Sequence, residues 1–124
     1  MLARPVAEFI QINAITNYDE KEWLDFDICF SWDCNYRVAL ELNNGALLVS
    51  ATVVLPEYAI QDSLLAALAL VGDMAFLAPR IAVAASERNE LLFFTSIPIQ
   101  DCTVSELCCA VDRLISAHRQ LEHL

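Results

Sequence analysis

The pattern of apolar and polar positions predicts two helices near the ends of the chain. The first is expected over residues 4–13, where Val6, Phe9 and Ile10 fall on one face at helical spacing. The last begins after Thr103, which opens a capping box with the glutamate three residues later. Its apolar stripe consists of Leu107, Val111, Leu114, Ile115, His118 and Leu121.

Alternation predicts two strands between these helices, and a segment rich in β-branched residues predicts a third. In WLDFDICFSW every second residue is apolar, which is the pattern of a half-buried strand. YRVALELNNG alternates again and ends in Asn-Asn-Gly, residues that accept the positive φ of a hairpin turn. ALLVSATVVL follows as a third strand with fewer polar positions on its outer face, so we expect that face to be more covered. The charged segment TNYDEKE is expected to be a loop.

The second half adds a central helix and a second hairpin. Pro56 closes the third strand, and the pattern predicts a helix over residues 58–77. RIAVAAS and LLFFTSIPI then form two strands around the polar tip ERNE. The predicted fold class is α+β, in the order α-β-β-β-α-β-β-α, with an antiparallel five-stranded sheet packed with helices. The 124 residues fit one domain over 1–124.

The central helix lacks a polar face, since Asp73 is the one charge in SLLAALALVGDMAFLAP. One side can pack on the sheet, but in a two-layer domain the opposite side has nothing to cover it. A symmetric homodimer through this helix is the simplest solution. The alternative is that loops and the last helix cover it within one chain. The predicted dimer-interface residues are Leu64, Leu65, Leu68, Val71 and Gly72.

Composition narrows the classes of partner. The net charge is −10, which argues against nucleic acid and against anionic lipid. Hydrophobic residues nevertheless make up 57% of the chain, which suggests that some of them serve a partner. No signal peptide or membrane span is apparent, so we expect a cytoplasmic protein. The acidic residues between 19 and 33 are expected to form a solvated face or to steer a basic partner.

Candidate chemistry is sparse, and we expect neither an enzyme nor a bound cofactor or metal. His118 and His123 have no Cys or carboxylate at a ligand or catalytic spacing, and His118 is expected at the edge of its helix. With two glycines in the chain, no glycine-rich phosphate loop is available. The cysteines show no C-x-x-C spacing and are expected to be reduced thiols. They are Cys29, Cys34, Cys102, Cys108 and Cys109.

The second half of the chain resembles a known family. Over residues 63–120 an apolar helix, a strand, a polar hairpin, a strand ending at a proline and a capped helix follow one another, and IPIQDCTVSEL forms the junction before the last helix. PVAEFIQ stands where the family has its opening helix, and three short strands follow. In element order, size, acidity and lack of catalytic groups, the chain resembles class I type III secretion chaperones, the Tir-chaperone-like family.

This resemblance implies a cytoplasmic bacterial homodimer that binds the N-terminal chaperone-binding segment of a secreted effector. It would keep that segment competent for export and help to present it to the export ATPase. We expect the segment over the first helix and the first three strands, because a short helix covers only part of a sheet. The expected effector-binding residues are Val6, Phe9, Ile10, Phe26, Ile28 and Phe30.

Two other classes of function stay open from the sequence. One is a YbjN-like or chaperone-derived regulatory or adaptor domain, which would bind a regulator in place of an effector. The other is a small enzyme, although the residues offer no convergent polar set.

Overall fold

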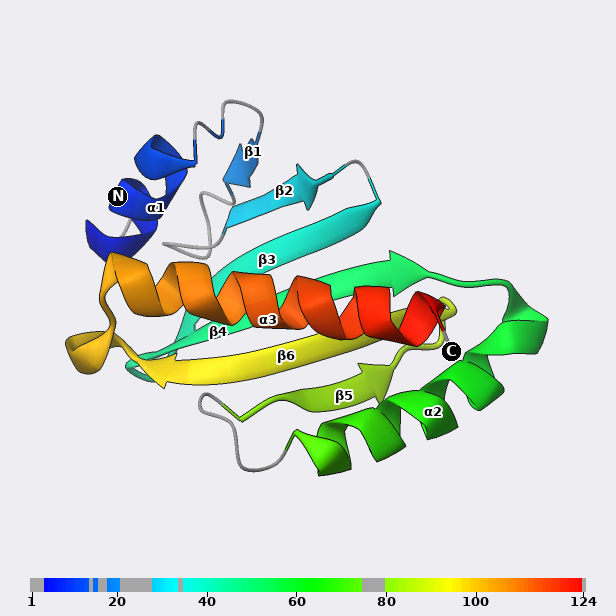
Figure 1. Ribbon diagram of the computed structural model, residues 1–124. Coiled ribbons are helices and arrows are strands. Elements are labelled where there is room, and N and C mark those ends of the chain that lie inside the picture. Colours follow the sequence, from blue (N-terminus) through cyan, green and yellow to red (C-terminus); the bar gives the residue numbers. More distant parts are fainter. Residues whose placement is uncertain are drawn as a thin grey trace.

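The computed structural model describes residues 4–13, 15, 18–20, 28–33, 35–74 and 80–123. Three helices and one sheet make up the described ranges (Figure 1). Two short 3₁₀ turns precede α2 and α3. In chain order the elements are α1 (Arg4–Ile12), β1 (Tyr18–Glu20), β2 (Ile28–Trp32), β3 (Tyr36–Asn43), β4 (Ala46–Val54), η2 (Glu57–Ala59), α2 (Ile60–Asp73), β5 (Ala82–Ala85), β6 (Glu90–Pro98), η3 (Ile99–Asp101) and α3 (Val104–Glu122).

The sheet is antiparallel, in the order β1-β2-β3-β4-β6-β5 among the described residues. Its five longer strands correspond to the five predicted from the sequence, so the α+β fold class is confirmed. The structure adds β1, a three-residue strand that pairs with β2 and that the sequence assigned to a loop. Tyr-Asp-Glu is short and charged, which is common for an edge strand and leaves no alternation to detect.

The hairpin between β3 and β4 follows from its turn residues. Asn44 has a φ of 51° and Gly45 a φ of 78°, the left-handed values that Asn and Gly tolerate best. This turn fixes the register, in which Leu40 pairs with Val49 and Ala39 with Ser50. The predicted hairpin is thereby confirmed, and its register decides which side chains face the helices.

The helices lie on one face of the sheet, where the core forms (Figure 1). α3 crosses β4 and β6, α1 packs beside the start of α3, and α2 lies along β5. The Thr103 hydroxyl accepts a hydrogen bond from the Glu106 backbone N–H at 3.1 Å, so the predicted N-cap of α3 is confirmed. Of the predicted α3 stripe, every residue except the half-buried Leu121 is buried.

The central helix is shorter than the sequence predicts. α2 begins at Ile60, after the 3₁₀ turn over Glu57–Ala59, and ends at Asp73, where the Met74 N–H closes the last turn onto Leu70 and Val71. The predicted end at residue 77 is wrong because apolar periodicity continues past the helix and does not mark the turn. Residues 75–79 lie outside the described ranges.

Candidate partner-binding surfaces

The outward side of α2 carries an exposed apolar stripe. Leu65 is 60% exposed and Leu68 51% exposed, and Gly72 continues the same line one turn later. The opposite side is anchored by Ala67, which is fully buried, with Ile60 and Val71 packed against the core. α2 therefore buries one side within the chain and leaves leucines on the other.

The five predicted interface residues divide between these two sides. Leu65, Leu68 and Gly72 face outward, whereas Leu64 and Val71 are partly buried against the core. The sequence could not separate the two groups because both sides of the helix are apolar, so helical periodicity gives no polar reference face. The dimer itself stays a prediction.

Most of the predicted effector-binding residues lie between α1 and β2 and are buried. Val6 and Phe9 are 0% exposed, Ile28 is 2% exposed and Phe30 is 4% exposed. The Phe9 ring lies 6.0 Å from that of Phe30 and 6.2 Å from that of Trp32, measured between centroids. These contacts hold α1 against the sheet, and ring separations of this size are typical of packed aromatic pairs.

Val6, Phe9, Ile28 and Phe30 are part of the core in this conformation, and their role in effector binding stays a prediction. Ile10 is half-buried, and Phe26 lies outside the described residues. Alternation predicts that the β2 residues share a face, but it does not say whether that face is core or groove. The wider placement of the effector over α1 and the first strands stays a prediction.

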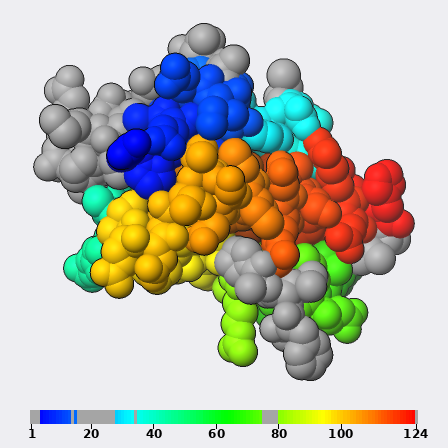
Figure 2. All heavy atoms as spheres, turned by 60° about the vertical axis from the view of Figure 1, so that its left-hand side comes forward, coloured from blue at the N-terminus to red at the C-terminus, as the bar shows by residue number. Residues whose placement is uncertain are grey.

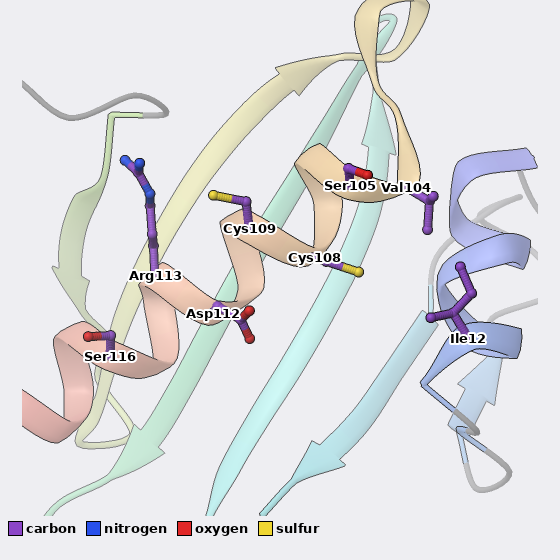
Figure 3. A pocket seen from close by; sticks show the side chains of 8 residues that line it. All are labelled: Ile12, Val104, Ser105, Cys108, Cys109, Asp112, Arg113 and Ser116. Atoms are coloured by element: carbon purple, nitrogen blue, oxygen red, sulfur yellow. The ribbon is translucent and has the colours of Figure 1, made fainter.

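A hollow of about 650 Å³ runs along the outer surface of α3 (Figure 3). Ile12, which is 64% exposed, borders it at the end of α1. Figure 2 shows α1, in blue, lying against the first turns of α3. The outward face of α3 can be recognised only once its buried face is known. The hollow exists because the side chains on this outward face are small. They are Ser105, Cys109, Asp112 and Ser116.

His118 is the one histidine in the buried core of the described residues, with 1% exposure, so its expected place at a helix edge is wrong. Its Nε2 lies 2.7 Å from the Ala51 carbonyl oxygen, and since a carbonyl only accepts, Nε2 carries the proton and donates. The ring stacks on Tyr36 at 5.3 Å and meets the edge of Phe93 at 4.7 Å. Burial lowers the pKa of the His118 imidazole below its ordinary value, although the bond to Ala51 and the charge of Glu122 oppose this.

Tyr36 extends this polar cluster to the end of α3. Its hydroxyl donates to Glu122 Oε1 at 2.7 Å. Burial, and then the hydrogen bond to Glu122, raise the pKa of Tyr36. The cluster joins α3 to β3 and β4 through the hydrogen bonds Tyr36–Glu122 and His118–Ala51.

The described residues provide no cluster of three His, Cys, Asp or Glu side chains that could hold a metal ion. The described cysteines are free: Cys102 is buried, Cys29 and Cys108 are half-buried and Cys109 is exposed, whereas Cys34 is outside the described ranges. Burial, and then the charge of Glu106, raise the pKa of the Cys102 thiol, which disfavours the reactive thiolate. Within the described ranges, no helix has both the length and the apolarity that a membrane crossing requires.

Comparison of the whole structure with solved structures identifies the fold. The chain is similar to the Yersinia pestis type III secretion chaperone SycH, solved with a stable fragment of YscM2, with a TM-score of 0.70 and 16% identity over 96% of this chain and 98% of that one. It is similar to a chain of the ExsC–ExsE complex, with a TM-score of 0.71 and 18% identity over 97% and 90%. The fold is that of type III secretion chaperones.

The chaperone fold also occurs in a protein with another description. YbjN, a putative transcription regulator from Escherichia coli, matches with a TM-score of 0.61 and 12% identity over 94% of this chain and 84% of that one. No protein-family model matches the sequence, and no curated protein does. The shared property is therefore the fold, and the function has to be argued from the surfaces that this chain presents.

Proposed function

We propose that the chain is a cytoplasmic secretion chaperone, which binds the N-terminal segment of a protein exported by a type III secretion system and keeps it competent for export. The observation that carries the proposal is the likeness over nearly the full length to chaperones solved in complex with partner proteins.

The working unit would be a homodimer through α2. The exposed leucines Leu65 and Leu68 support this, because apolar side chains on the outside of a helix gain free energy when a second copy covers them. The partner segment would lie on α1 and the first strands, away from the dimer interface. An extended segment could also add to the sheet edge at β1, whose outer backbone groups have no neighbouring strand among the described residues.

The alternative is a regulatory domain like YbjN, favoured by the similarity to that structure. Capture with the tagged chain in its own host distinguishes the two functions. The proposal expects a captured protein whose export stops when the gene for this chain is deleted. It also expects a purified N-terminal fragment of that protein to bind the chain directly.

A captured regulator whose release into the medium is independent of this chain would instead establish the alternative. Hydrogen exchange with the bound fragment then tests the surface. Protection is expected in α1 and β2–β4. Protection confined to α3 would show that the partner binds elsewhere.

A further inference from the structure

A cavity of about 90 Å³ lies between the start of α2 and the end of α3. Ser63 lines it from α2, and His118 and Glu122 line it from α3. The remaining wall is apolar and consists of Val53, Leu55, Leu91 and Leu121. The volume exceeds the roughly 10–15 Å³ that one water molecule needs, and the three polar side chains offer water its hydrogen-bond partners. The cavity can therefore hold water between the two helices.

His118 is the group at this cavity whose charge can change near neutral pH. Its Nε2 donates to the Ala51 carbonyl oxygen at 2.7 Å, so a second proton has to go to Nδ1. The Ser63 hydroxyl and the Glu122 carboxylate line the cavity and can accept from Nδ1–H, either directly or through water. One Glu122 oxygen already accepts the Tyr36 hydroxyl at 2.7 Å. Charging the ring therefore draws water into the space between α2 and α3.

The groups that face His118 from other elements carry no charge at neutral pH. They are Tyr36 on β3, Ala51 on β4, Phe93 on β6 and Ser63 on α2. On α3 itself Arg119 pairs with Asp33, and Glu122 is the charged group that acts on the ring within the described ranges. Burial outweighs the attraction of Glu122, so the pKa of His118 lies below its ordinary value. The closed cavity therefore disfavours the imidazolium.

Of the two helices beside the cavity, α2 is the less firmly held. Ala67 is its one buried residue, whereas seven residues of α3 are buried. α2 lies along β5, an edge strand of four residues, none of which is buried (Figure 1). Elements with little buried apolar surface open locally at a lower free energy than the rest of a fold. Water that enters the cavity therefore separates α2 from α3 before α3 leaves the sheet.

We infer that His118 and its cavity form a proton-operated switch, which holds α2 against the end of α3 at neutral pH and releases it when His118 takes up a proton. The switch operates whether or not the chain is a secretion chaperone. Its exposed leucines Leu65 and Leu68 move with α2, so a second copy bound to them is held less tightly at acidic pH.

The direction of the pH dependence follows from the two states of the cavity. Open to water, the ring titrates near its ordinary pKa of 6.5, and in the closed structure its pKa is lower. The preference for the closed state is therefore complete above pH 6.5 and is lost as the pH falls toward the lower pKa of the closed state.

Amide hydrogen exchange of the full-length protein, followed residue by residue by NMR, tests the switch. Protection factors are used because they remove the effect of pH on the exchange chemistry itself. At Leu64 and Ala67 in α2 they should fall by about three- to tenfold for the pH unit below 6.5, tenfold being the limit for one proton. The amides of α1 should keep their protection, because opening of α1 does not expose His118.

Matched variants assign the effect to the ring and its neighbour. His118→Gln removes the titrating group and should leave the α2 protection factors nearly constant, whereas His123→Gln at the end of α3 should retain the wild-type fall. Glu122→Gln removes the charge that favours the imidazolium in the closed state, so the fall should continue to lower pH. Glu106→Gln makes the same change in the first turn of α3 and should behave as wild type.

Nitrogen NMR of the wild-type ring gives a second measurement that needs no variant. Nδ1 should gain its proton over the pH range in which α2 loses protection. Protection factors in α2 that do not fall, or that fall equally in His118→Gln, would overturn the inference. Factors in α2 equal to those of β4 would do the same, because α2 would then open only when the whole chain unfolds. A ring that stays neutral while α2 loses protection would assign the effect to other groups.

Discussion

The packing of α1 against the sheet depends strongly on the side chain of Phe9. It is fully buried and packs against the rings of Phe30 and Trp32. Phe9→Ala would leave a cavity that the neighbouring rings cannot fill, so the free energy of unfolding should fall by about 3–5 kcal/mol. Urea denaturation followed by circular dichroism measures this. Ile12→Ala, which truncates a residue of the same helix that is 64% exposed, is expected to stay within about 0.5 kcal/mol of wild type.

His118 makes stability depend on pH in a defined direction. Its pKa in the folded protein is lowered from 6.5, so the unfolded chain takes up more protons as the pH falls through that value. The contribution of neutral His118 is therefore complete above pH 6.5 and is lost as the pH falls toward the lower folded pKa. Urea midpoints should decrease from about pH 7.5 to about pH 5.5, a range in which ordinary carboxylates stay ionised.

The chain has two histidines, which gives this pH experiment its control. His118→Gln removes the titrating group and keeps an N–H that can donate toward the Ala51 carbonyl, so the decrease should become smaller. His123→Gln changes the exposed histidine at the end of α3 and should retain the wild-type decrease. If the wild type and both variants lose equal stability as the pH falls, the pH dependence arises from groups other than His118.

At this scale, the sequence predicts which residues share a face but not what lies against that face. The α3 stripe is correctly predicted because leucine and valine at helical spacing are usually core. His118 lies on the same stripe, and its burial depends on the Ala51 carbonyl, a partner 67 residues away that no local pattern reveals. For the same reason, the apolar row of β2 could not be assigned to core or groove.

At the level of elements, the exposed apolar stripe of α2 predicts that the protein is a dimer. Leu68→Asp puts a charge in the centre of the exposed stripe, where a second copy would bury it without a partner. Light scattering of the wild type should give twice the 13.8 kDa chain mass, and the variant should give a single chain or insoluble protein. Ile12→Asp makes the same change on α1 and should leave the dimer intact. A wild type of one chain at micromolar concentration would contradict the dimer.

Element boundaries depend on signals of unequal strength. The β3–β4 hairpin and the start of α3 are predictable because Asn44-Gly45 and Thr103 act locally, through positive φ and a side-chain cap. β1 is not, because its pairing with β2 is a long-range choice that Tyr-Asp-Glu does not encode. The end of α2 is missed because no proline or glycine follows Asp73 directly, and apolar residues continue beyond it.

For the whole molecule, the excess of acidic residues should affect partner binding less than the apolar surfaces do. The net charge of −10 attracts a basic segment. Salt screens this attraction, and the screening length falls from about 10 Å at 0.1 M to about 3 Å at 1 M ionic strength. Buried apolar contacts keep their strength over that range. Titration calorimetry with the partner fragment should therefore show a loss of affinity below about tenfold, or about 1.4 kcal/mol. A much larger loss would mean that ion pairs dominate the interface.

The arrangement of the helices relative to the sheet is the part of the structure that sequence predicts least. Element order gives an α+β fold, but the face that α1 and α3 occupy follows from the full register of five strands. A shift of one residue in any strand exchanges its two faces. The sheet face opposite the helices could therefore be recognised only after the pairs Cys29–Ala39 and Ala39–Ser50 were known.

The pairing of β4 with β6 has a consequence for synthesis of the chain. Val54 pairs with Glu90 and Ala46 with Pro98, so the second neighbour of β4 is made about 40 residues later. At about 5–20 residues per second, β4 stays without that neighbour for roughly 2–8 s on the ribosome. An apolar strand edge exposed for seconds is prone to aggregate. Synonymous slow codons between residues 55 and 90 should therefore lower the soluble yield, whereas the same codons placed after Pro98 should not.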